Sequence, residues 1–171
     1  MDTTALTEEA VENRWQLGVC AQIINEAGEI LLIQRASNDW CAWVWEMPGG
    51  SVEHDEDLIT SIAREVKEET SLDIIGIPEL VCHFDFFNEE NGKTKRKFCF
   101  RVRTTGDIRL SLDHGAYRFM SLDDIKQLKV QSDDSDPYEI FYDHAQILLQ
   151  YKPSAHDSFN SPQQIDGDDH R

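Results

Sequence analysis

The chain has 171 residues, the length of one globular domain with short tails. It carries 33 acidic and 16 basic residues, for a formal net charge of −17 at pH 7. This charge argues against duplex DNA or long RNA as a partner, because basic residues drive the binding of phosphate polymers. A small nucleotide is not excluded, since its phosphates would meet a bound cation instead of bare protein.

The sequence also argues against a membrane protein. No stretch approaches the roughly 18 apolar residues of a membrane span, and the N-terminus lacks the apolar core of a signal peptide. The four cysteines, at positions 20, 41, 82 and 99, include no CxxC pair, which is typical of buried thiols in a reducing compartment. We therefore expect a cytoplasmic protein, either a monomer or a homodimer.

Three regions are expected along the chain. Residues 1–14 should form an acidic tail or a short helix, and residues 15–150 a single domain. Residues 151–171 form an acidic tail rich in Pro, Ser, Asn and Asp, a composition typical of disorder.

The domain is expected to begin with two strands. Residues 15–25 and 29–35 are largely apolar, and residues 26–28 have the composition of a turn. This pattern predicts a β-hairpin. Residues 40–50 follow as a loop that ends in a short strand.

A helix is predicted over about residues 56–70. Its apolar stripe should consist of Ile59, Ile62, Ala63 and Val66, which lie on one side at 100° per residue. We expect this stripe to anchor the helix in the core.

The rest of the domain predicts further strands and two helices. A turn at Asn91-Gly92 lies within this part, Ser121 to Asp124 form a capping box that opens a short helix, and residues 138–150 have the apolar spacing of a last helix. The predicted strands cover residues 74–77, 80–87, 95–103 and 117–120.

Three glutamates share one face of the predicted helix over 56–70. Glu65, Glu68 and Glu69 are three and four positions apart, so their charges repel. A hard divalent cation with a preference for oxygen ligands, magnesium or manganese, would resolve this repulsion. Arg64 lies beside the acidic face, where it is expected to orient Glu68. The alternative is an acidic solvated helix, which is common in a chain of this charge.

The segment from Gly50 to Leu72 resembles the Nudix box, G-x5-E-x7-R-E-U-x-E-E-x-G-U, in which U is aliphatic. Ser71 is the single departure, at a position where glycine is favoured because it accepts a left-handed helix cap. Serine there should cost stability or close the turn in another way, without removing a ligand. The matching residues are Gly50, Glu56, Arg64, Glu65, Val66, Glu68, Glu69 and Leu72.

The resemblance implies an α/β protein with the Nudix fold, an α-β-α sandwich around a mixed β-sheet. It also implies a site for Mg²⁺ or Mn²⁺, with Glu65, Glu68, Glu69 and the carbonyl group of Gly49 as ligands. Gly49 belongs to a segment similar to the family's W-x-x-P-G-G approach to the box, in which Trp45 is expected to serve packing.

The resemblance further implies a catalytic set of Glu68, Glu65, Arg64 and Asp113. Relatives often supply a carboxylate from the loop before a strand similar to Y-R-W-V-S-L, which residues 117–122 match here. Asp113 is therefore the candidate for a distant base, and a plain turn aspartate is the alternative. His114 is expected to be a solvated loop residue.

Four residues are candidates for substrate binding. Arg35 closes a strand similar to the family's L-L-x-x-R and would reach a phosphate, or else form a surface ion pair. Trp43, like Trp40, would stack on a base. Asp133 and Asp134 would hydrogen-bond an oxidised purine, although a helix-capping loop explains them better.

The chain has one basic run, in which strand alternation should point Cys99 outward and three apolar residues inward. Three interpretations stay open: a phosphate-facing strand, an intramolecular partner for the acidic tails, or a dimer contact. The cations are Lys93, Lys95, Arg96, Lys97, Arg101 and Arg103, and the inward residues are Phe98, Phe100 and Val102.

By resemblance, the protein is expected to be a magnesium-dependent pyrophosphohydrolase of nucleoside diphosphates linked to a moiety X. The first choice is a MutT-like reaction on a nucleoside triphosphate, with oxidised purines included, that gives the nucleoside monophosphate and pyrophosphate. An ADP-ribose or nucleotide-sugar pyrophosphatase is the enzymatic alternative. A nucleotide-binding sensor without turnover is the alternative of another class, and an acidic scaffold for protein partners leaves the box unexplained.

Overall fold

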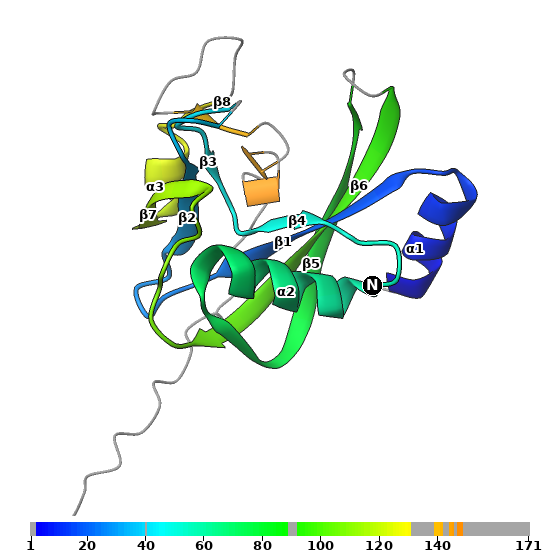
Figure 1. Cartoon of the computed structure of the whole chain (residues 1–171), viewed down its shortest axis with the longest axis horizontal. Coiled ribbons are helices and arrows are strands. Elements are labelled where there is room, and N and C mark those ends of the chain that lie inside the picture. Colours follow the sequence, from blue (N-terminus) through cyan, green and yellow to red (C-terminus); the bar gives the residue numbers. More distant parts are fainter. Residues whose placement is uncertain are drawn as a thin grey trace, which may run out of the picture.

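The computed structural model describes residues 3–39, 41–88, 92–130, 139–141, 144–145 and 147–148. These residues form two β-sheets and three named helices (Figure 1). The predicted α/β class is confirmed, although the strands form two mixed sheets and not one. None of the helices in these ranges is long and apolar enough to cross a lipid bilayer.

The first sheet has the strand order β4-β1-β6-β5. Strand β1 (Gln16–Ile23) runs antiparallel to β4 (Gly49–Ser51) and parallel to β6 (Lys93–Thr105). Strand β5 (Asp73–Asn88) pairs antiparallel with β6 along nearly its whole length. Two separate strands were predicted over 74–87, and the structure instead has one strand with two register shifts.

The second sheet has the order β7-β2-β3-β9-β8. Its strands are β2 (Ile30–Arg35), β3 (Trp45–Glu46), β7 (His114–Met120), β8 (Lys129–Val130) and β9 (Glu139–Ile140). Strands β2 and β3 are antiparallel, whereas β9 runs parallel to β3 and β8.

The predicted hairpin of the first two strands is wrong. Strands β1 and β2 lie in different sheets, and one isolated bridge joins Ile24, the residue after β1, to Ile30. The turn between them is present, with Gly28 at φ 79°. Strand β1 pairs with β4 and β6, and β2 pairs with β3 and β7, so neither strand has a side left for its neighbour in the chain.

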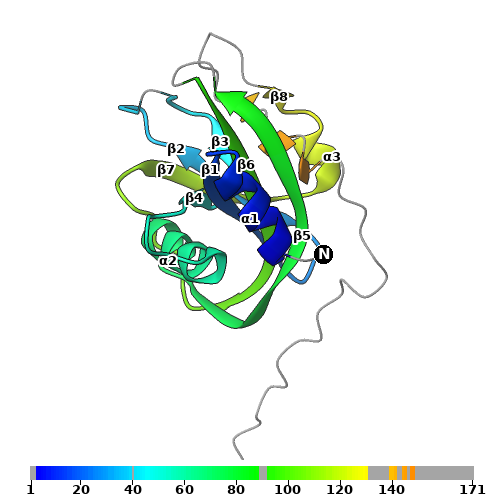
Figure 2. The same ribbon diagram turned by 90° about the vertical axis from the view of Figure 1, so that its right-hand side faces the viewer.

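Helix α2 (Leu58–Thr70) covers one face of the first sheet (Figure 2). Asp57 caps its first turn by accepting a hydrogen bond from the Thr60 backbone at 2.7 Å. Its buried apolar residues are Leu58, Ile62 and Val66, which pack against β1 and β6. The predicted stripe is therefore half wrong, because Ile59 and Ala63 are exposed.

The opposite face of the first sheet packs against the second sheet. Helix α3 (Leu122–Ile125) joins this core and opens with the predicted capping box at Ser121. The predicted helix over 138–150 begins too early, since residues 139–140 form β9. Residues 144–145 and 147–148 are helical, and the tail 151–171 lies outside the described residues.

Strand β6 is buried on both faces over its central part. Phe98, Phe100 and Val102 point to the core under α2, as predicted. Cys99 was predicted to point outward, but it is fully buried in the second core with Cys20. The prediction failed because alternation separates two faces without showing that one of them meets solvent.

Within the basic run, Arg96 attaches helix α1 (Thr3–Glu12) to the sheet. Its guanidinium lies 2.7 Å from Glu9 on α1 and 2.7 Å from Asp85 on β5. It also lies 4.9 Å from the centre of the Trp15 ring. For this residue, the interpretation as an intramolecular partner of the acidic N-terminal segment is confirmed.

Ser71 ends α2 in the left-handed conformation predicted for this position. Its backbone has φ 63° and ψ 4°, and its N–H donates to the Lys67 carbonyl group. The hydroxyl group donates to the Arg109 carbonyl at 2.9 Å. This bond secures the segment after β6 against the end of the helix.

Two substitutions at Ser71 should separate backbone strain from the hydroxyl contact. Ser71→Ala removes the hydrogen bond and keeps the strain, whereas Ser71→Gly removes both. We expect the glycine variant to be more stable than the alanine variant by about 1 kcal/mol. Urea unfolding of the two variants checks this, and equal midpoints would contradict a strained cap.

Candidate active site

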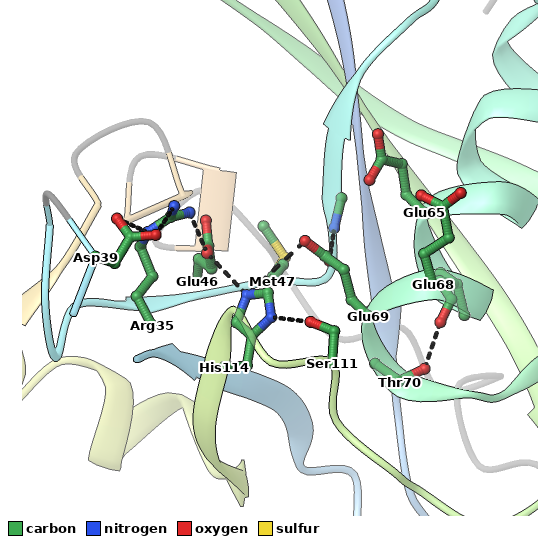
Figure 3. A network of polar contacts seen from close by, with 12 residues as sticks. Arg35, Asp39, Glu46, Met47, Glu65, Glu68, Glu69, Thr70, Ser111 and His114 are labelled. Carbon is green, nitrogen blue, oxygen red and sulfur yellow. Dashed lines mark hydrogen bonds and ion pairs between the residues drawn. The ribbon is translucent and has the colours of Figure 1, made fainter. Parts of the chain in front are cut away.

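The site lies where α2 meets both sheets. The carbonyl groups at the end of α2 are satisfied by the segment before β7: Ser111 N donates to Glu69 O at 3.1 Å, and Arg109 N donates to Thr70 O at 2.9 Å. These bonds bring His114, the first residue of β7, beside Glu69. Strands β3 and β4 approach from the other side, so residues distant in sequence converge here (Figure 3).

Arg64 forms ion pairs with three carboxylates of the box. Its Nε and Nη2 donate to the two oxygens of Glu56 at 2.7 and 2.9 Å. Its Nη1 lies 2.9 Å from Glu65 and 3.1 Å from Glu68. The anticipated contact with Glu68 is thus present, together with contacts to Glu56 and Glu65 that were not anticipated. The hydrogen bonds from Arg64, with a further one from Ser61, lower the pKa of Glu56 to about 2.

Glu69 is directed differently from the other two helix glutamates. Figure 3 shows Glu65 and Glu68 close together, while Glu69 points toward His114. Glu69 accepts a hydrogen bond from the Gly49 backbone N–H at 2.8 Å, and its side chain is 16% exposed. Burial, reinforced by the charge of nearby Glu46, raises the pKa of Glu69 to about 9.

Glu65 is also shielded from solvent, with 13% of its side chain exposed. Burial raises its pKa, against the opposing effect of its hydrogen bond with Arg64. Glu68 is the accessible member of the set, with 59% of its side chain exposed. The three glutamates therefore occupy one helix edge in three distinct environments.

A buried polar chain next to Glu69 was missed in the sequence. Glu46 accepts a hydrogen bond from Arg35 Nη1 at 2.9 Å and lies 3.2 Å from His114 Nε2. Burial alone would raise the pKa of Glu46. The hydrogen bond with His114 and the nearby cations together have the larger effect, so the pKa is lowered. Because an ionised carboxylate only accepts, His114 Nε2 is the donor in this pair. Ser111 Oγ lies 3.1 Å from the other ring nitrogen.

The expectation of a solvated His114 is wrong, since its side chain is 1% exposed. Its neighbour Asp113 is exposed, and the backbone carbonyl group of Asp113 accepts a bond from Ala36 N at 2.8 Å. The loop turns so that the histidine faces the site while the aspartate faces solvent.

The structure describes only some of the candidate substrate-binding residues. Arg35 forms ion pairs with Asp39 at 2.6 Å and with Glu46, which matches the ion-pair interpretation, although on a half-buried residue. Trp43 is 43% exposed and has φ 72°. Trp45 is buried in the core, as predicted. The other candidates, Trp40, Asp133 and Asp134, lie outside the described residues.

The four expected ligands suit a hard divalent cation, although their oxygen atoms do not surround a common point in this structure. In the part of the chain that the structure describes, no three acidic, histidine or cysteine side chains are arranged to hold a metal ion. Arg64 forms ion pairs with Glu65 and Glu68, and the Gly49 N–H donates a hydrogen bond to Glu69. All four expected donors are nevertheless oxygens, which suit Mg²⁺ or Mn²⁺.

The two glycines of β4 make room for this site. Gly49 has φ 155°, and a Cβ there would overlap the Val19 carbonyl group on β1. A Cβ on Gly50 would overlap the Glu65 carboxyl group. The close approach of backbone and carboxylate at this point is therefore possible only with glycine.

Comparison with known proteins agrees with this geometry. The NUDIX domain profile matches residues 14–141. The chain is 36% identical to the 8-oxo-dGDP phosphatase NUDT18 of Mus musculus over 90 residues, which are 53% of this chain and 26% of that protein. It is 30% identical to the 8-oxo-dGTP diphosphatase of Buchnera aphidicola over 113 residues, which are 66% of this chain and 83% of that protein.

Among solved structures, the MutT protein from Methanosarcina mazei Go1 superposes with a TM-score of 0.64 at 28% identity, over 79% of this chain and 91% of that chain. The chain spans only about a quarter of the length of the mouse relative. The profile nevertheless covers well over half of this chain, and the residues of the Nudix box lie on β4, on α2 and in the segments directly before and after α2. The chain belongs to the NUDIX domain family, that of the Nudix hydrolases.

Proposed function

We propose that the protein hydrolyses the phosphoric anhydride bond of a nucleoside triphosphate, with magnesium or manganese as cofactor. One observation carries this proposal: Glu65, Glu68 and Glu69 lie on one edge of α2, against a strand of two glycines, with Arg64 bound to two of them. A purely structural helix gains nothing from three adjacent carboxylates, two of which have their pKa raised by burial.

The residues that would hold the metal are Glu65, Glu68, Glu69 and the carbonyl group of Gly49. A divalent cation held there would neutralise charge on phosphoryl oxygens and would make a nearby water a better nucleophile. Arg64 would keep its bidentate contact with Glu56 and so hold the acidic edge in place. To share a cation, Glu65 and Glu68 would have to leave Arg64, and Glu69 would have to turn from the Gly49 N–H.

We assign the general base to Glu68, whose side chain is the most exposed of the three. Its carboxylate would take a proton from the attacking water, whose oxygen bonds to phosphorus as the bridging P–O bond breaks. The products are the nucleoside monophosphate, pyrophosphate and a proton. Asp113, exposed at the start of β7, is the alternative base.

The nucleobase preference is inferred from relatives. The similar proteins of Buchnera aphidicola and Mus musculus are described as acting on 8-oxo-dGTP and 8-oxo-dGDP, respectively. We propose that an oxidised purine nucleotide is the substrate of this chain as well. Arg35 and Trp43 lie next to each other, joined by a 3.2 Å backbone hydrogen bond, and are our candidates for contacts to the phosphate and the base.

A nucleotide panel tests the proposed function. It should contain normal and 8-oxo-dGTP, 8-oxo-dGDP, a dinucleoside polyphosphate and ADP-ribose, each with Mg²⁺, with Mn²⁺ and with EDTA. We expect the highest kcat/KM for an oxidised purine nucleotide, no turnover in EDTA, and pyrophosphate from the triphosphate. Preferred cleavage of ADP-ribose would overturn the substrate assignment. Nucleotide binding without any product would indicate a sensor and reject the enzyme.

Metal binding should release a proton, because Glu69 is a proposed ligand whose pKa is raised to about 9. At pH 7.5 the metal-free carboxyl group is protonated, and it must lose this proton to bind a cation. Calorimetric Mg²⁺ titrations in buffers of different ionisation enthalpy should show about one proton released per chain at pH 7.5. The apparent affinity should rise with pH up to about pH 9. Proton release that is the same in Glu69→Gln as in the wild type would contradict the assignment of Glu69 as a metal ligand.

A further inference from the structure

We propose that Cys82 and Cys99 are a redox-active pair that hydrogen peroxide converts into an intrachain disulfide, with Cys82 as the attacking residue. This modification site is independent of the proposed hydrolysis. It is carried by a row of three thiols that crosses the first sheet.

The row runs over three neighbouring strands. Cys20 on β1 is the register partner of Cys99 on β6, and Cys99 is the register partner of Cys82 on β5. As register partners, the three residues lie side by side across the sheet. All three side chains face the core between the two sheets. Cys41, the remaining cysteine, is buried in the segment before β3, outside this row.

A register shift creates the pair. Leu80 pairs with Phe100, so a regular ladder would place Val81 opposite Cys99. The shift between Leu80 and Cys82 inserts one residue and brings Cys82 opposite Cys99 instead. Directly opposed residues on antiparallel strands have Cα atoms about 4.5–5.5 Å apart. This spacing falls within the range of about 4.4–6.8 Å that disulfides require.

The same geometry restricts which disulfides can form. Cys20 and Cys82 are separated by the whole width of β6, so their Cα atoms are about 9–10 Å apart. That distance is beyond the reach of a disulfide without movement of the backbone. Cys99, between the two, is therefore required for any bridge within the row.

Access and hydrogen bonding select the attacking thiol. Cys82 is partly exposed, whereas Cys20 and Cys99 are buried. The hydrogen bond with Cys99 lowers the pKa of Cys82, and the contacts of Cys99 with both neighbours raise the pKa of Cys99. The thiolate is the nucleophile, so peroxide reacts at Cys82.

The oxidation proceeds in two balanced steps. The Cys82 sulfur attacks one oxygen of hydrogen peroxide, the O–O bond breaks, and the leaving hydroxide takes a proton to form water. Cys82 is then a sulfenic acid. The Cys99 sulfur attacks the Cys82 sulfur, the S–O bond breaks, and the hydroxide leaves with the Cys99 proton as a second water. Two thiols are oxidised to one disulfide and one peroxide is reduced to two waters.

Peptide mapping of the full chain tests this site. The reduced protein is treated with hydrogen peroxide, blocked with N-ethylmaleimide and digested with trypsin, which places the four cysteines on four different peptides. We expect residues 68–93 linked to residues 98–101, with a loss of two hydrogens that dithiothreitol reverses. Four alkylated thiols, or a bridge that contains Cys41, would overturn the proposal. So would a bridge between Cys20 and Cys99 in place of Cys82.

Single substitutions sharpen the result without depending on enzyme activity. In Cys99→Ser, whose hydroxyl group can still donate a hydrogen bond to Cys82, the bridge should be absent, and dimedone should trap the sulfenic acid at Cys82. Cys20→Ala and the control Cys41→Ala should both keep the bridge, after circular dichroism has shown that they are folded. A folded Cys99→Ser variant without a dimedone adduct, or a folded Cys20→Ala variant without the bridge, would overturn the mechanism. If a variant does not fold, the peptide map of the oxidised wild-type chain still shows whether the bridge forms.

Discussion

Replacement of Glu68 by glutamine should lower kcat by about 10²–10⁴-fold, the range for removal of a positioned acid–base group. The substitution keeps the shape and the contact with Arg64 but removes the negative charge and the proton acceptor. Stability should hardly change, because the side chain is 59% exposed. The measurement is steady-state hydrolysis of the best nucleotide of the panel, with a parallel thermal melt.

Two further variants complete this experiment. Glu26→Gln is the matched control, since Glu26 is an exposed glutamate in the turn between β1 and β2 and should leave kcat unchanged. Because Glu68 is also a proposed metal ligand, all variants are assayed at saturating Mg²⁺, where Asp113→Asn should lower kcat far less than Glu68→Gln. If Glu68→Gln keeps wild-type turnover while Asp113→Asn loses it, the base has been assigned to the wrong residue.

The elements of the fold were predictable, but the pairing of the strands was not. The hydrophobic period identifies a helix or a strand from its own residues, and α2 and β6 were placed within about two residues of their observed limits. Partner choice depends on residues far away in the chain. Strand β1 pairs with β6, about 80 residues later, and nothing within 16–35 distinguishes that arrangement from a hairpin.

The metal-ligand candidates were predictable from a local pattern, whereas the residues around them depend on partners far away in the chain. The helix glutamates form a local pattern, so spacing alone put them on one face. The contact between Glu46 and His114 joins residues 68 positions apart, and each of them is isolated in the sequence. One local signal was available: Glu46 stands between Trp45 and Met47 in a segment predicted to end in a strand. A buried carboxylate requires a donor or a cation, and the search for its partner would have led to Arg35 and His114.

Replacement of Arg64 by alanine should lower kcat/KM by about 10- to 100-fold, the usual cost of losing a residue that orients metal ligands. Glu56, Glu65 and Glu68 would lose their common cation and repel one another, so the melting temperature should also fall, by about 2–4 °C. Arg64→Lys should recover part of the melting temperature, because the charge is kept. It should recover less of the activity, because an ammonium group cannot reproduce the bidentate contact with Glu56.

The pH dependence of this effect has a definite sign. Arg64 lowers the pKa of Glu56 from 4.5 to about 2, so the pair stabilises the folded chain above pH 4.5 and its contribution is lost as the pH falls toward 2. The difference in melting temperature between wild type and Arg64→Ala should therefore be full at pH 7 and shrink between pH 4.5 and 2. Arg109→Ala, at an exposed arginine, is the control and should show no such trend. A difference that is constant with pH would mean that Arg64 stabilises α2 through packing alone, and the acidic edge would then have to be held in place by something other than this guanidinium.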